Sequence, residues 1–203
     1  MTNTKSDMDV KIGVMIWPDS LDIEPDVADR FQKALNKLQA SHSPFARIDM
    51  TDYDFSAARR AGLLISEYEG AQYHAAQYEK TPEGFSEAFM SMLNWAVDQP
   101  PEKHEQAEAV ISSVQARAAE VFQNIDILIA PTAPQTAFAF GSPIPVGQAD
   151  FTAFANLCDL AAAQIAIESG RNGLPVGLQI IGPDNGVVLA IAESFENRLR
   201  VRN

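Results

Sequence analysis

The strongest constraint on the fold comes from three short apolar segments, each followed by a proline. They are VKIGVMIW at 10–17, IDILIA at 125–130 and GLQIIG at 177–182. Each is far shorter than the roughly 20 apolar residues that cross a bilayer. Each is also too continuously apolar to leave one face in water. We therefore predict three buried strands in a sheet with helices on both faces.

Amphipathic segments separate these strands. Residues 24–41 repeat apolar side chains at helical spacing after an early proline, and a short strand is predicted for residues 45–50. A strand, a helix and a strand at this spacing predict a parallel βαβ unit. Residues 55–99, with Leu63 and Leu64 on an inner face, and residues 101–124 are also helical in pattern.

The rest of the chain begins with an irregular connection at 131–149, which contains four prolines and two glycines. A short helix opened by Asp150 as N-cap is predicted for 150–162, and a strand for 163–167. That strand should pair antiparallel with GLQIIG across a turn, before Asp184 caps a last helix. The pattern is that of an α/β fold with a mixed β-sheet flanked by helices. We predict a disordered polar lead-in over 1–9 and a single domain over 10–203.

Composition excludes several classes of partner. The net charge is −12 and the pI about 4.6, which argues against nucleic acids and anionic membrane surfaces. Cys158 is the single cysteine, so no disulfide can form within the chain and a reducing compartment is indicated. The polar N-terminus lacks the apolar core of a signal peptide. We expect a cytoplasmic protein that binds neither nucleic acid nor membranes.

Familiar reaction centres are missing from the sequence. It has no G-x-S-x-G elbow and no phosphate-binding glycine loop. None of His42, His74 and His104 has a second ligand at metal-binding spacing, so we expect no metal and no cofactor. Cys158 could be a nucleophile only beside a base, and its apolar setting favours a buried structural thiol.

An acidic cluster could hold calcium or serve local structure. Asp49, Asp52 and Asp54 lie within DMTDYDF, but the glycine and final glutamate of an EF-hand are missing. We therefore favour roles in turns and helix capping.

A family resemblance emerges from the C-terminal third. DILIAPTAP at 126–134, DFTAFANL at 150–157 and GLPVGLQIIGP at 173–183, followed by an amphipathic helix, resemble the C-terminal part of the amidase signature family. The similarity extends over about residues 10–199. The phrase NLCDLAA at 156–162 is similar to the allophanate hydrolase branch.

The resemblance implies a hydrolase of carboxamides that uses a serine nucleophile, a second serine in a cis peptide and a lysine. The glycine- and serine-rich loop of such enzymes has no counterpart here, because the one Ser-Ser pair, Ser112–Ser113, falls in a predicted helix. We therefore assign no catalytic residue. We expect an amidase fragment without its catalytic half, inactive alone. The alternative is a non-catalytic amidase-derived binding or assembly module, which Asp159 and Ala161 favour because they depart from the family pattern.

The resemblance also implies where a substrate amide would lie. Thr132, Phe151 and Asn156 occupy segments that border the active-site mouth in the family, and they are the candidate substrate-binding residues. Structural roles are the alternative: a turn hydroxyl, a helix-entry contact and a scaffold amide, respectively. A fragment of this kind should expose apolar surface and strand edges, so we expect a homo-oligomer or a partner chain that supplies the missing half.

Overall fold

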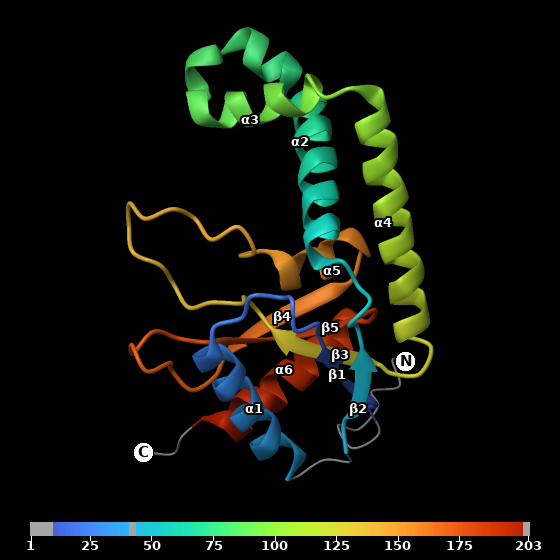
Figure 1. The fold of residues 1–203 in the computed structure, drawn as a ribbon, viewed down its shortest axis with the longest axis vertical. Helices are drawn as coiled ribbons and strands as arrows, with labels where there is room; N and C mark the ends of the chain where they lie inside the picture. Colours follow the sequence, from blue (N-terminus) through green and yellow to red (C-terminus); the bar gives the residue numbers. More distant parts are fainter. Residues whose placement is uncertain (1–9, 41–43, 201–203) are drawn as a thin grey trace.

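The computed structural model describes residues 10–40 and 44–200. At its centre lies a five-stranded mixed sheet, which confirms the predicted fold class (Figure 1). The order across the sheet is β2 (Ala46–Asp49), β1 (Ile12–Ile16), β3 (Ile127–Pro131), β5 (Gly177–Gly182) and β4 (Ala161–Ala166). β2 and β4 are therefore the two edge strands.

The strands β1, β2 and β3 run parallel. Gly13 lies opposite Ala46 of β2, and Ile12 lies opposite Ile127 of β3. Helix α1 (Pro25–Gln39) connects β1 to β2. The predicted parallel βαβ unit is confirmed.

The strand β5 runs antiparallel to both of its neighbours. Leu128 of β3 lies opposite Ile181, and Gln164 of β4 lies opposite Gln179. Gly173, in the connection between β4 and β5, has a φ of 78°, a backbone conformation that favours glycine. The predicted antiparallel pair is confirmed, and the sheet changes from parallel to antiparallel at β3.

Helices cover both faces of the sheet, as predicted. On one face, α1 and α6 (Asn185–Leu199) pack against the sheet around Phe31, Ile180 and Phe195. On the other face, α5 (Asp150–Leu157) and the ends of two long helices pack around Leu128, Phe154 and Ile181. All of these side chains are at most 2% exposed. The face under α5 carries the residues of the candidate site.

A helical arm extends away from the sheet (Figure 1). It consists of α2 (Phe55–Lys80), the short 3₁₀ helix η1 (Pro82–Gly84), α3 (Glu87–Val97) and α4 (Pro101–Val121). A small cluster of buried side chains, Ala61, Leu64, Ala96 and Ala107, joins the helices of the arm. The predicted inner position of Leu63 is wrong, because α2 turns Ala61 and Leu64 inward and leaves Leu63 48% exposed.

Two predictions around α5 are also wrong in detail. The helix ends at Leu157 and not at 162, because Asp159 adopts a φ of 51° and Ala161 pairs with Gly182 in β4. Asp150 is the first helical residue and not the N-cap, which is Ala149. The predicted lead-in at 1–9 lies outside the described residues, as does His42. Among the described helices, none combines the length and the apolar composition that a bilayer crossing requires.

Candidate functional site

The end of β3 brings Thr132 onto the helix-covered side of the sheet under α5. Its backbone N–H donates to the Gly177 carbonyl at 2.9 Å, which extends the β3–β5 pairing by one residue. Its side-chain oxygen is buried, with no hydrogen-bond partner in the described part of the chain. A buried hydroxyl without a partner costs free energy and marks a position where another polar group can bind.

Two glutamines lie on the same face of the sheet as Thr132. Gln179 of β5 is 3% exposed and lies between Ala130 of β3 and Gln164 of β4. Its side-chain nitrogen is also buried, and no partner for it occurs within residues 10–40 and 44–200. Two buried polar atoms, one on Thr132 just after β3 and one on Gln179 in β5, therefore lack partners among the described residues.

Gly177 leaves room for these side chains to meet. A Cβ atom at this position would lie 2.6 Å from the Thr132 hydroxyl oxygen and 2.8 Å from Nε2 of Gln164. We call Thr132, Gln164 and Gln179 the β3–β5 polar cluster. A hydroxyl and two carboxamides offer both donors and acceptors, so the cluster can hydrogen-bond the carbonyl or the N–H of an amide.

Phe151 lies in the core beneath this region. It is fully buried, and its ring centroid is 5.6 Å from that of Trp17 and 5.6 Å from that of Phe55. Both contacts are edge-on, the favourable arrangement for aromatic pairs. Phe151 thus fixes the first turn of α5 against the sheet.

Asn156 lies on the exposed side of α5. Its side-chain amide donates to the Thr152 carbonyl of the same helix at 3.3 Å. The three predicted residues therefore occupy three different environments: a buried polar position, the apolar core and the surface.

A buried ion pair fixes α5 to the arm. Nε of Arg59, in α2, donates to Oδ1 of Asp150 at 2.6 Å, and the two side chains are 15% and 7% exposed. Gly147 approaches the same carboxylate, since a Cβ there would lie 2.7 Å from its other oxygen. The pair anchors the end of the irregular 132–149 segment next to the candidate site.

Other polar side chains of the described chain serve structure. Burial raises the pKa of the Cys158 thiol to about 11, so the thiol stays protonated at neutral pH and is a poor nucleophile. Nε2 of His104 lies 3.0 Å from the Ala96 carbonyl. Within the described ranges, no group of histidine, cysteine and acidic side chains has a metal-binding arrangement.

The acidic cluster has the structural role that the sequence favoured. Asp49 accepts hydrogen bonds from the backbone and the hydroxyl of Thr51, at 3.0 and 2.7 Å. Asp54 caps α2 by accepting from the Ala57 N–H at 2.8 Å. Both side chains are committed to the turn between β2 and α2.

The sequence pointed to Thr132 as a candidate, which stays a prediction, whereas Gln164 and Gln179 were not among the predicted residues. A usable signal was present, because a glutamine interrupts each of the two otherwise apolar strands AQIAI and GLQIIG. Only the strand register shows that the two lie side by side and next to Thr132.

Known proteins resemble this chain over most of its length. The family model described as Amidase matches residues 1–186. Over 95% of its length, the chain is 26% identical to one component of the glutamyl-tRNA(Gln) amidotransferase from Halothermothrix orenii, and it covers 46% of that protein. It is also 26% identical to 2-amino-5-chloromuconic acid deaminase from Comamonas testosteroni, with 80% of this chain and 37% of that protein covered.

Solved structures show the same fold. An amidase crystal structure aligns with 94% of the chain and 46% of its own length, at a TM-score of 0.76 and 20% identity. Allophanate hydrolase from Kluyveromyces lactis aligns with 96% of the chain and 33% of its own length, at a TM-score of 0.71 and 20% identity. The chain thus spans less than half the length of these relatives. With a family match over most of its residues, the chain belongs to the amidase family.

Proposed function

We propose that these residues form the scaffold half of an amide hydrolase, in which the β3–β5 polar cluster borders the substrate amide. The observation that carries this is the pair of buried, unpartnered atoms on Thr132 and Gln179, in a chain of the amidase family. The hydroxyl and carboxamide groups suit the carbonyl and N–H of a carboxamide. Phe151 fixes the first turn of α5 against the same face of the sheet, and Asn156 lies on the exposed side of α5.

On this proposal, amide hydrolysis needs a nucleophile and a base that are missing from this sequence. The resemblance implies a serine nucleophile in a glycine- and serine-rich loop, and no Gly-Ser-Ser run occurs here. A nucleophile needs a base and a tetrahedral intermediate needs oxyanion donors. We therefore propose that a second polypeptide segment supplies both and that the 203 residues alone do not hydrolyse amides.

Two surfaces support a partner segment. Among the strands of residues 10–40 and 44–200, none pairs with the outer side of the edge strand β4. Three of its side chains, Ala162, Gln164 and Ala166, are exposed on the face of the polar cluster. The irregular 132–149 segment projects away from the sheet (Figure 1) and exposes large apolar side chains, among them Phe140, Ile144 and Val146 at 110%, 71% and 80%. Exposed edges and apolar patches of this kind mark association sites.

The inactivity is tested with a fluorophosphonate probe and a panel of small carboxamides. We expect neither labelling nor turnover by the 203 residues. Specific labelling of a serine in this chain would overturn the proposal that the nucleophile lies elsewhere. Reading the coding sequence that precedes the Met1 codon for a lysine and a Gly-Ser-Ser run separates an enzyme from a non-catalytic binding or assembly module.

The association is tested by light scattering and by binding of a hydrophobic dye. We expect an oligomer, or a monomer that binds dye through the 132–149 segment. The variant F140S/I144S/V146S should lose this behaviour, whereas L189S, which changes a single apolar side chain 65% exposed on α6, should keep it. A monodisperse monomer that binds no dye would count against a partner surface.

Two finer assignments are also proposals. The phrase NLCDLAA and the fold shared with an allophanate hydrolase support that branch, and the test is hydrolysis of allophanate against simple carboxamides after the catalytic segment is added. The single cysteine supports a reducing compartment, and we propose the cytoplasm. Fractionation of cells that produce the protein tests this location.

A further inference from the structure

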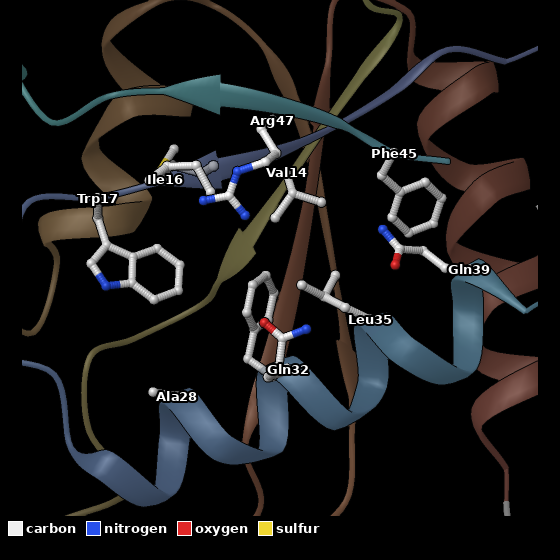
Figure 2. Close-up of a pocket in the computed structure, with 11 residues that line it drawn as sticks. Val14, Ile16, Trp17, Ala28, Gln32, Leu35, Gln39, Phe45 and Arg47 are labelled. Carbon is white, nitrogen blue, oxygen red and sulfur yellow. The ribbon is translucent and has the colours of Figure 1, made fainter. Parts of the chain in front are cut away.

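A cleft of about 560 Å³ lies between α1 and the strands β1 and β2, away from the β3–β5 polar cluster (Figure 2). It forms because α1 packs toward β3 and α6, while β2 is the outermost strand at this edge. The face of β2 that points toward α1 therefore remains open. Its volume is within the range of small-molecule sites, about 300–1,000 Å³.

The walls of the cleft are apolar and firmly held. Val14, Leu35 and Phe45 line it and are 6%, 5% and 8% exposed. Trp17 stands at one end and Phe45 at the other (Figure 2). The ring of Trp17 is fixed by Phe31 and Phe151, with centroids 5.8 and 5.6 Å away. Such walls suit a flat or branched apolar group.

Three polar side chains point into this cleft: Arg47 from β2, and Gln32 and Gln39 from α1 (Figure 2). Arg47 lies opposite Val14 in the β1–β2 register, which directs its side chain to the face of α1. Gln32 donates to Asn36 at 3.0 Å, so part of its amide remains available. The guanidinium and the amides are donors suited to an oxyanion.

The charge of the cleft points to an anion. None of the described residues that line it is acidic, although the chain carries a net charge of −12. In the described part of the chain, Arg47 forms no hydrogen bond or ion pair. The neighbouring carboxylate, Asp49, is committed to Thr51, whose hydrogen bonds lower the pKa of Asp49, with smaller contributions from Arg117 and Arg47.

We propose that the cleft binds a small organic carboxylate with an aromatic or branched apolar tail. The guanidinium of Arg47 would hold the carboxylate, with the amide of Gln39 as a second donor. The tail would pack between Trp17 and Leu35. This proposal uses none of the β3–β5 polar cluster and does not depend on amide hydrolysis.

Tryptophan fluorescence provides the test. The chain has two tryptophans, and Trp95 is 50% exposed on α3, so the W95F variant leaves Trp17 as the reporter. We expect 4-phenylbutyrate to change this signal saturably, with a dissociation constant on the order of 1 mM, and neutral 4-phenylbutyramide to bind about tenfold or more weakly. R47Q should remove this preference, whereas R60Q, a change at an exposed arginine on α2, should retain it.

A second variant guards against indirect effects. A28L fills the cleft from α1 and should abolish binding of the acid and the amide alike, with an unchanged melting temperature. Equal affinity of the acid and the amide, unaltered binding by R47Q, or no saturable signal in W95F would overturn the proposal. Light scattering that shows a dimer, together with Trp17 fluorescence that changes on dimerisation and not with ligand, would also overturn it, because a second copy of the chain would then fill the cleft.

Discussion

Arg59 and Asp150 hold α5 to the helical arm through a nearly buried ion pair, with Nε and Oδ1 2.6 Å apart. Asp150 closes the irregular 132–149 segment and opens α5, a helix that packs on the same face of the sheet as the candidate site. The position of this helix therefore depends on a charge supplied by a different part of the chain.

The R59M variant tests the dependence. Removing one partner leaves an uncompensated carboxylate in the interior, and we expect the free energy of unfolding to fall by about 3–5 kcal/mol. Urea denaturation measures the change. R60M should stay within about 0.5 kcal/mol of the parent, because Arg60 is exposed. An R59M variant as stable as R60M would show that the pair contributes nothing.

The unpartnered hydroxyl of Thr132 predicts an unusual stabilisation. T132V removes a buried polar group that has no partner in the described structure, so we expect the free energy of unfolding to rise by about 1 kcal/mol. Thr136 is the matched control, because its hydroxyl donates to Glu24 at 3.1 Å and accepts from Asn172 at 3.0 Å. T136V should lower the same free energy by about 1–3 kcal/mol. Equal effects of the two variants would contradict the proposed ligand-binding role of Thr132.

The thiol of Cys158 is half-buried and not fully buried as predicted, and it predicts slow alkylation and a pH-dependent stability. Its pKa of about 11 lies above the ordinary value of 9.0, so at pH 8 the native chain should react with iodoacetamide far more slowly than the urea-unfolded chain. Between pH 9 and 11 the thiol keeps its proton in the folded state but loses it in the unfolded state. Stability from this group is therefore present below pH 9 and is lost as the pH rises toward 11. C158A should remove that contribution, and rapid native-state alkylation would contradict the burial.

The start of α6 depends on one side chain. Oδ1 of Asp184 accepts from the Val187 N–H at 3.0 Å, as the sequence predicted. D184A should lower the free energy of unfolding by about 1 kcal/mol, while D184N, which keeps the acceptor, should cost only a fraction of that. Thermal unfolding followed by circular dichroism compares the two. A D184N variant as unstable as D184A would attribute the effect to charge and not to the hydrogen bond.

The strands were predictable because their apolar runs end at glycine or proline. GLQIIG became β5 with its predicted bounds, and the antiparallel partner was found across the turn. The predicted helix extended wrongly over the alanines at 161–162, because alanine favours helices. In the structure, pairing with β5 holds these residues in a strand. The boundary between α5 and β4 is set by strand pairing with a distant part of the chain, which the local sequence pattern does not show.

The candidate site was predictable only in part. Thr132 came from a phrase that resembles the amidase family, whereas Gln164 and Gln179 needed the strand register. Phe151 was predicted to bind substrate because its segment borders the active site in the family, but its side chain is fully buried in the core. A segment next to a site therefore also contains residues that only support the fold. The cleft beside Arg47 had no signature in the sequence, because its walls come from three separated elements.

The helical arm differs from the sheet in how little of it is buried. α2 is 26 residues and about 39 Å long, yet beyond Glu67 none of its side chains is buried. The outer part of the arm is joined by half-exposed aromatic contacts, among them those of His74 with Phe85 and Phe89, with ring centroids 5.7 Å apart in both pairs. Changes to the outer arm should therefore leave the register of the five strands as it is, because none of the side chains of α2 beyond Glu67 belongs to the buried core.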